Sequence, residues 1–303
     1  MNAKRRGPAA RPADQATGPM YEGRPLANPE EEIFDQGLAF DLGTLLDRRR
    51  MLKVMGASAL GVGLFALVGC GPSSSGGSLG GSTAAATGGG ATGGCIVIPE
   101  ETAGPYPADG SNGPDVLSQS GIVRHDIRSS FGDFVGAAEG VPLTINLVIK
   151  DASNDCAPVA GAAVYLWHCD RDGNYSLYTV TDQNYLRGVR KAGSDGVVTF
   201  NSIFPGCYSG RWPHIHFEVY RTLSSATDDA NKIATSQIAL PEATCKAVYA
   251  TDGYGQSVAN LRQVSLQTDS VFGDDGGAHQ LGTVSGRVGE GLAVALAVPV
   301  QTA

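Results

Sequence analysis

Residues 141–150 read VPLTINLVIK, a stretch in which apolar and polar side chains alternate. The apolar positions are Leu143, Ile145, Leu147 and Ile149, and the polar ones between and after them include Thr144, Asn146 and Lys150. Successive side chains of a β-strand point to opposite faces, so a repeat of two predicts a strand with one buried face. This stretch therefore indicates a chain that builds a β-sheet with a core on one side.

Further short strands are expected on both sides of this one, separated by turns. The expected strands are 162–169, 197–200, 214–221, 233–240 and 292–300. Asp172-Gly173 and Asp195-Gly196 are tight-turn signals, and only 241–250, with Pro and Glu at its start, is expected to be helical. Short strands with frequent turns predict an all-β fold, a β-sandwich of mixed or antiparallel strands with large loops and one short helix.

The N-terminal part has the pattern of a targeting segment. Residues 48–70 contain Arg48-Arg49-Arg50-Met51-Leu52-Lys53, then an apolar run and Cys70, as in a signal peptide. The basic motif resembles a twin-arginine (Tat) export signal, and 67–70 (LVGC) resembles a lipoprotein cleavage box in which Cys70 becomes lipidated. A plain membrane anchor is the alternative, although the run is shorter than the about 20 residues of a typical spanning helix. We therefore expect an exported, periplasmic or cell-surface protein tethered to a membrane.

Composition divides the rest of the chain. Residues 1–47 are rich in Pro, Gly and charge without a repeat and are expected to be disordered. Either the region before the apolar run is unusually long for a signal peptide, or the true start is a later Met such as Met20. Residues 71–94 are almost entirely Gly, Ser, Ala and Thr, which predicts a flexible linker. Residues 95–303 are long enough for a folded domain with its own core. The net charge of the chain is -8 and this domain has no basic stripe, which argues against nucleic-acid binding.

Cysteine usage agrees with export. Five cysteines lie beyond Cys70, so at least one thiol stays free or pairs outside the chain. An oxidising compartment permits disulfides, and a Cys207–Cys245 pair is favoured because both residues flank the strands around the candidate site. The five are Cys95, Cys156, Cys169, Cys207 and Cys245.

Two histidines and two tyrosines form that candidate site. His214 and His216 are separated by one residue in an apolar strand, so both imidazoles point to one face and Ile215 to the other. Tyr175 and Tyr208 each follow a tight turn at the end of a strand, where functional side chains gather on a rigid scaffold. Phenolate oxygens with imidazole nitrogens suit ferric iron better than zinc, whose structural sites take Cys and His.

Each of these residues has a simpler explanation when it is taken alone. A histidine in a core strand is often only hydrogen-bonded, and a tyrosine at a turn often packs its ring and leaves its hydroxyl in water. His168, beside Trp167 in mid-strand, is expected to be such a core histidine, and Asp170 and Asp172 are expected to form a turn. The combination of four residues is what favours a metal.

The order of motifs along the chain resembles one enzyme family. The motifs are Thr102-Ala103-Gly104-Pro105-Tyr106, Trp167-His168-x-Asp170-x-Asp172-Gly173-Asn174-Tyr175-Ser176, Leu186-Arg187-Gly188, Pro205-Gly206-Cys207-Tyr208 and Arg211-Trp212-Pro213-His214-Ile215-His216-Phe217. Over about residues 95–275 the chain resembles the intradiol ring-cleavage dioxygenases, the family of protocatechuate 3,4-dioxygenase and catechol 1,2-dioxygenase. The resemblance implies a non-haem Fe(III) held by Tyr175, Tyr208, His214 and His216, with O2 as co-substrate.

The resemblance also implies roles for residues around the iron. An aromatic diol binds as a dianion and displaces Tyr208 and a bound hydroxide, and its ring opens between the two hydroxylated carbons to give a muconate-type diacid. Arg211 stabilises the carbanion-like substrate. The positions implied for substrate binding are Gly104, Pro105 and Tyr106 at the mouth and Gln237 near the pocket. The best-known members are cytosolic and have a helical dimerisation region, which this chain lacks, so an oligomer is possible but the subunit count stays open.

Two other interpretations explain part of the sequence. Residues 158–162 and the turn at 195–200 also occur in prealbumin-like and carboxypeptidase-regulatory β-sandwich modules, which would make the domain a non-enzymatic binding or spacer module. Alternatively, the two histidines alone bind copper or zinc. The first interpretation predicts no iron and tolerance of Phe at both tyrosines, and the second predicts a metal that is retained after both tyrosines change.

Overall fold

The computed structural model describes residues 20–21, 24–25 and 95–302 of the chain. The expected signal peptide with Cys70, the linker that follows it and most of the expected disordered extension lie outside these residues. Within the described part of the chain, no helix is long and apolar enough to cross a membrane.

The chain divides into two units, Met1–Gly93 and Gly94–Ala303. In the first unit, β1 (Met20–Tyr21) pairs antiparallel with β2 (Arg24–Pro25). The second unit contains every other described strand and all the predicted site residues except Cys70.

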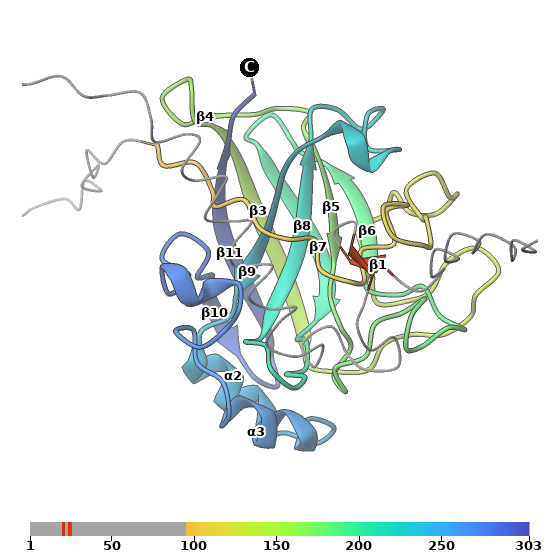
Figure 1. The fold of residues 1–303 in the computed structure, drawn as a ribbon, viewed down its shortest axis with the longest axis vertical. Helices are drawn as coiled ribbons and strands as arrows, with labels where there is room; N and C mark the ends of the chain where they lie inside the picture. Colours follow the sequence, from red (N-terminus) through yellow and green to blue (C-terminus); the bar gives the residue numbers. More distant parts are fainter. Residues whose placement is uncertain (1–19, 22–23, 26–94, 303) are drawn as a thin grey trace, which may run out of the picture. The chain divides into compact units, whose positions relative to one another are not determined.

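Two sheets pack face to face in the second unit (Figure 1). The first sheet contains β10 (Thr283–Arg287), β11 (Gly291–Val300), β3 (Pro142–Asp151) and β4 (Ala157–Pro158), with β7 (Val197–Ile203) also paired to β3. The second sheet has the order β6 (Arg187–Lys191), β5 (Ala163–Trp167), β8 (His214–Tyr220) and β9 (Lys232–Ala239). Neighbours in these sheets are antiparallel except β11 and β3, which run parallel. The predicted all-β sandwich of mixed strands is confirmed.

The space between the sheets is filled by the apolar faces that the alternation predicts. The four apolar residues of β3 are at most 2% exposed, namely Leu143, Ile145, Leu147 and Ile149. They share one cluster with side chains of β5 and β8, namely Val164, Leu166, Ile215, Phe217 and Val219. Because full burial of one such side chain contributes about 1.5–3 kcal/mol, this layer is a major source of stability.

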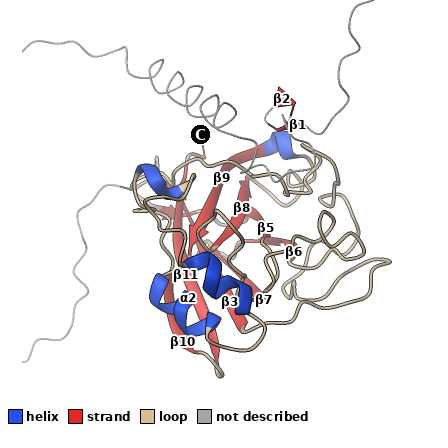
Figure 2. Ribbon diagram, turned by 60° about the horizontal axis from the view of Figure 1, so that its bottom comes forward, coloured by secondary structure: helices blue, strands red, loops and turns tan. Residues whose placement is uncertain are grey.

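The opposite face of the second sheet is covered by loops. Ala163, Tyr165 and Trp167 of β5 lie in a second cluster with Tyr175 and with apolar residues from the segment 108–131. Figures 1 and 2 show loops gathered on the β5 and β6 side of the molecule. β5 is therefore buried on both faces, which explains why its sequence, AVYLW, is apolar throughout.

The expected strands are confirmed as β3, β5, β7, β8, β9 and β11, and the expected helix as α2 (Glu242–Tyr249). The alternation does not predict β6, β10 or the helix α3 (Gly255–Leu261). β6 (RGVRK) and β10 (TVSGR) are too polar to show a repeat of two, and α3 is too short to show one of 3.6. Pairing with β5 and β11 makes strands of these two segments, so tertiary context decides their structure.

The helices α2 and α3 lie together at one end of the sandwich and hold the loop that leads to β8 (Figure 1). The hydroxyl of Tyr249 donates to the Pro205 carbonyl (3.1 Å), and the amide of Asn260 donates to the Cys207 carbonyl (2.8 Å). The Cys207 N–H donates to Ser257 Oγ at 2.9 Å. Both helices therefore fix the segment that carries one of the candidate tyrosines.

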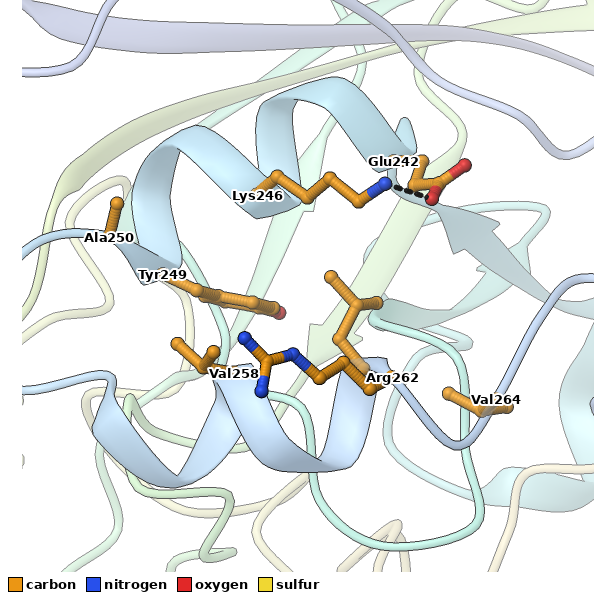
Figure 3. Close-up of a pocket in the computed structure, with 8 residues that line it drawn as sticks. Glu242, Lys246, Tyr249, Ala250, Val258, Arg262 and Val264 are labelled. Atoms are coloured by element: carbon orange, nitrogen blue, oxygen red, sulfur yellow. Dashed lines mark ion pairs between the residues drawn. The ribbon is translucent and has the colours of Figure 1, made fainter.

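The same helices border a groove of about 480 Å³ (Figure 3). Its lining is mainly apolar, with an ion pair between Glu242 and Lys246 (2.5 Å). The lining residues are Glu242, Lys246, Tyr249, Ala250, Val258, Leu261, Arg262 and Val264. None of the predicted site residues is among them, so this groove is separate from the candidate site.

The disulfide pattern differs from the prediction. Cys95 is joined to Cys156, with Cα atoms 5.5 Å apart, and Cys169, Cys207 and Cys245 are buried free thiols. The predicted Cys207–Cys245 disulfide is therefore wrong. Each of these two thiols donates instead to a carbonyl four or five residues away on its own segment. The loop before β8 is thus held to the helices by hydrogen bonds and not by a covalent link.

Candidate functional site

The four predicted metal ligands come together from three segments of the chain. His214 and His216 are on β8, Tyr175 follows the turn after β5, and Tyr208 is on the loop before β8. The Nε2 atoms of the two histidines are 3.0 Å apart. The hydroxyl oxygens of Tyr208 and Tyr175 lie 3.2 Å and 3.5 Å from His214 Nε2. The structure thus forms one cluster from side chains that the sequence placed up to 41 residues apart.

The two imidazoles are oriented by the groups around them. His214 Nδ1 donates to the Trp212 carbonyl (2.5 Å), which leaves the lone pair of Nε2 facing the cluster. The His216 ring stacks on Trp167, with centroids 4.9 Å apart and planes at 4°. Gly104 closes over His216 with a φ of +73°, and a Cβ added to it would lie 3.2 Å from His216 Cε1. Close approach and backbone conformation both favour glycine at this position.

The turns that carry the two tyrosines also approach each other closely. Asp170 Oδ1 accepts from the N–H of Asp172 (3.0 Å) in the turn before Tyr175, so these two acids form a turn as predicted. Gly173 in that turn has a φ of +88°, and a Cβ there would lie 3.0 Å from Tyr208 Cβ. A side chain at this glycine would therefore push the two tyrosines apart.

Burial controls protonation in the cluster. It raises the pKa of Tyr175 and of Tyr208, and the positive charge of Arg211 offsets this only in part. Burial lowers the pKa of His214 and of His216 well below the usual value, and the charge of Arg211 adds to the effect. The neutral imidazoles are ready to donate lone pairs, whereas the phenols ionise only when a strong positive charge compensates for burial.

The donor set fits a ferric ion. Two ligands that are about 2.1 Å from one metal and at right angles to each other lie about 3.0 Å apart, close to the separations observed here. Two phenolates and two imidazoles suit Fe(III), because anionic oxygen is a hard donor and imidazole is a good iron ligand. Among the described residues, no three or more His, Cys, Asp or Glu side chains gather as a metal site.

A buried arginine borders the cluster. Arg211 is 2% exposed, and its Nη1 lies 3.5 Å from His214 Nε2. Its Nε donates to Asp269 Oδ2 (2.9 Å), and its Nη2 donates to Gln237 Oε1 (2.7 Å). Burial by itself lowers the pKa of Arg211, but Tyr208 and Asp269 raise it above the usual value, so the group stays charged. Arg211 and Gln237 were predicted for the site, whereas no sequence motif marks Asp269.

The loop that contains Gly104, Pro105 and Tyr106 reaches the cluster, as expected for a substrate mouth. The ring centroid of Tyr106 is 4.9 Å from that of Tyr175 and 5.0 Å from that of Tyr178. Tyr178 is a further member of this aromatic group that no local pattern indicates. The three loop residues are therefore in place beside the candidate ligands, and their contact with a substrate stays a prediction.

His168 is a hydrogen-bonded core histidine, as predicted. Its Nδ1 donates to the Cys169 carbonyl (2.7 Å), and its Nε2 accepts from the Ser202 hydroxyl (2.7 Å). Burial lowers its pKa to about 4, so the ring is neutral at physiological pH. Both of its nitrogens are engaged, which leaves neither for a metal.

Similar proteins are found by sequence and by structure. No model of a known protein family matches the chain. A chlorocatechol 1,2-dioxygenase from Rhodococcus opacus is 39% identical over 62 residues. These residues are 20% of this chain and 23% of that protein, so the chain matches about a quarter of this relative's length.

Structural similarity extends over most of the folded domain. The solved structure of an intradiol ring-cleavage dioxygenase from Tetranychus urticae has a TM-score of 0.54 and 25% sequence identity, over 68% of this chain and 95% of that chain. A second dioxygenase structure has a TM-score of 0.53 and 25% identity over the same shares. These relatives are oxidoreductases that incorporate O2. The predicted resemblance to the intradiol ring-cleavage dioxygenases is therefore confirmed, and the domain has the fold of this enzyme class.

Proposed function

We propose that the domain is a non-haem Fe(III) intradiol dioxygenase. It cleaves the ring of a catechol-type diol between the two hydroxylated carbons with O2 and yields a muconate-type diacid. The observation that carries this proposal is the convergence of two tyrosine oxygens and a second histidine nitrogen within 3.5 Å of His214 Nε2. The relatives support the reaction class, since one is an intradiol ring-cleavage dioxygenase and another is a chlorocatechol 1,2-dioxygenase.

In this proposal Tyr175, Tyr208, His214 and His216 hold the iron. When bound, ferric iron acts as a Lewis acid that withdraws electron density from the diol and prepares the ring for attack by O2. The two imidazoles bind without losing a proton, because burial already keeps them neutral. The two phenols must each lose one, so loading the site releases two protons.

Tyr208 is the ligand best placed to leave when a diol arrives. It is half-buried, whereas the other three are at most 2% exposed, and it lies on a loop and not on a strand. Burial raises the pKa of its hydroxyl, so this side chain is stable as a neutral phenol once it is away from the iron. A proton from one diol hydroxyl can move to Tyr208 Oη, which leaves that tyrosine as a neutral phenol and the diol oxygen as an anion.

Arg211 supplies a fixed positive charge beside the reacting ring. A guanidinium keeps its proton at any physiological pH, so it acts by charge and by hydrogen bonding and not as an acid. Negative charge that develops on the ring carbon is stabilised by a cation held in place beforehand in a buried site. Arg211 is thus expected to affect turnover much more than iron binding.

Oxygen consumption and product mass test the proposal. Iron-loaded protein is mixed with catechol, protocatechuate, hydroxyquinol and larger catechols, and O2 uptake is recorded with the mass of each product. The expected product contains both atoms of one O2 and has an opened ring. Tyr208→Phe should reduce the rate strongly, whereas Tyr254→Phe, a change at a buried tyrosine held by the Phe204 carbonyl, should not. An iron-loaded protein that consumes no O2 with any of these diols would contradict the proposal.

We further propose that residues 48–70 export the domain and that a lipid on Cys70 tethers it to a membrane surface, in the periplasm or at the cell surface. The support is the sequence pattern, a basic start followed by an apolar run and a cysteine. Mass spectrometry of the N-terminal peptide from the membrane fraction should give the mass of an acylated Cys70. An intact leader with an unmodified cysteine would contradict the lipid anchor.

A further inference from the structure

Backbone hydrogen bonds hold the carboxylate of Asp269 in place independently of Arg211. Its side chain is fully buried. Oδ1 accepts from the N–H groups of Val271 (2.8 Å) and Phe272 (3.0 Å), and Oδ2 accepts from the N–H of Trp212 (2.6 Å). Three backbone donors thus fix both oxygens, and they join the segment after α3 to the segment just before β8.

The fixed carboxylate in turn fixes the arginine. Arg211 Nε donates to Asp269 Oδ2 (2.9 Å), and Nη2 lies 3.4 Å from Oδ1, so one edge of the guanidinium faces the carboxylate. Nη2 also donates to Gln237 Oε1 (2.7 Å), and Gln237 is itself held because its Nε2 donates to the Thr102 carbonyl (3.0 Å). Nη1 lies on the side of the cluster, 3.5 Å from His214 Nε2.

We propose that Asp269 is a positioning residue for ring cleavage, which aims the Arg211 guanidinium at the reacting diol and touches neither the iron nor the diol. This inference rests on the proposed function. An arginine side chain has several rotatable bonds, and its charge is useful only when it is held where negative charge develops. Without Asp269, the guanidinium loses the carboxylate that holds its Nε and Nη2 edge, so its charge is no longer fixed at one place beside the diol.

Four forms of the full-length, iron-loaded protein test this role: wild type, Asp269→Asn, Arg211→Ala and the double variant. Iron content, the phenolate-to-iron absorption band, catechol affinity from the change in that band, and kcat and KM are measured for each. Asp269→Asn should keep the iron, the band and the catechol affinity, with KM within about threefold and kcat lower by about 10- to 100-fold. Added to Arg211→Ala, it should lower kcat no further, because both changes remove the same interaction.

A matched control comes from an exposed pair of the same chemistry. Asp126 forms an ion pair with Arg128 on the surface, and both side chains are more than 40% exposed. Asp126→Asn makes the same chemical change away from the site and should leave all the measured quantities at their wild-type values.

The outcomes separate this inference from the proposed function. A wild-type kcat in Asp269→Asn, a loss of iron, or an additional loss of kcat in the double variant would overturn the positioning role and leave the dioxygenase proposal intact. Wild-type protein that turns over no diol would remove both. If Asp269→Asn does not fold, Asp269→Glu, whose longer side chain shifts the carboxylate within this buried site, is measured instead and should likewise keep the iron and the band but lower kcat. Failure of both variants to fold would show a structural role and overturn the proposal.

Discussion

The two faces of strand β8 differ in what they contribute to the molecule. One face joins the apolar core between the sheets through Ile215, Phe217 and Val219. The other face carries the imidazoles of the candidate metal site, His214 and His216. Because side chains alternate along a strand, stability and chemistry lie next to each other in sequence but on opposite sides of the sheet. A shift of pairing by one residue would exchange the two faces, so the core that fixes the register also fixes the site.

The largest expected effects come from neighbouring residues on these two faces. His216→Ala should abolish iron binding and ring cleavage while the folded state survives, because it removes a metal ligand and little of the core. Phe217→Ala should lower the free energy of unfolding by about 3–5 kcal/mol, since it leaves a cavity in the core. Iron content and urea unfolding of the metal-free proteins separate these outcomes. A His216→Ala protein that keeps a full complement of iron would show that the two faces are assigned incorrectly.

Arg211→Ala should leave the iron in place and reduce turnover. The variant removes a fixed charge beside the reacting ring, and loss of one such group typically costs about 10²- to 10³-fold in kcat. Iron analysis with steady-state kinetics measures both effects on one sample. Unchanged kcat would remove Arg211 from the mechanism, and loss of iron would make it a support of the metal site instead.

Tyr208→Phe sharpens the comparison between strand and loop ligands. The change removes one phenolate, so the absorption band should weaken or shift while the two strand histidines still bind some iron. Iron affinity should fall by more than the roughly 10- to 100-fold that is typical when an outer-shell partner of a metal ligand is removed, because a direct ligand is lost here. A titration with ferric iron followed by absorption gives the affinity. Identical affinity and colour in Tyr208→Phe would exclude this tyrosine as a ligand.

An effect of pH on stability concerns the far end of the same polar face. Glu218 is buried, and burial, together with the charge of Asp109, raises its pKa to about 8 despite Lys232 Nζ at 3.3 Å. The folded state therefore holds a proton that the unfolded chain releases above its ordinary pKa of 4.5. Stability should fall between pH 4.5 and about 8, by at most about 1.4 kcal/mol per pH unit.

Glu218→Gln should remove this part of the pH dependence, because glutamine does not titrate. Urea unfolding of both proteins at pH 5, 6.5 and 8 tests the prediction. As the pH rises from 5 to 8, the unfolding free energy of the wild type should fall relative to that of Glu218→Gln. Parallel curves for the two proteins would show that Glu218 has the same pKa in the folded and unfolded states.

Local sequence patterns predicted much of the fold and part of the candidate site. The alternation in 141–150 identified β3 and its buried face, and the His-x-His spacing placed two imidazoles on one side of β8 with Ile215 on the other. The turn signal at Asp172-Gly173 located the segment that carries Tyr175. These features depend on residues close in sequence, where a repeat of two or a turn motif is sufficient.

Features that depend on distant contacts were not predictable in this way. β6 becomes a strand through its pairing with β5, and Asp269 meets Arg211 across a separation of 58 residues. The disulfide joins Cys95 to Cys156 across 61 residues, and cysteine spacing alone does not determine such a pairing. Contacts of this kind are set by the folded topology, so neither composition nor local pattern reveals them.

A visible absorption spectrum of the iron-reconstituted protein, before and after addition of catechol, tests the central claim most directly. Two tyrosine phenolates on ferric iron should give a red-brown band, and that band should shift when catechol binds. A protein that stays colourless after reconstitution would contradict the four-ligand ferric site. It would favour the alternative interpretation, in which the β-sandwich is a non-enzymatic binding or spacer module.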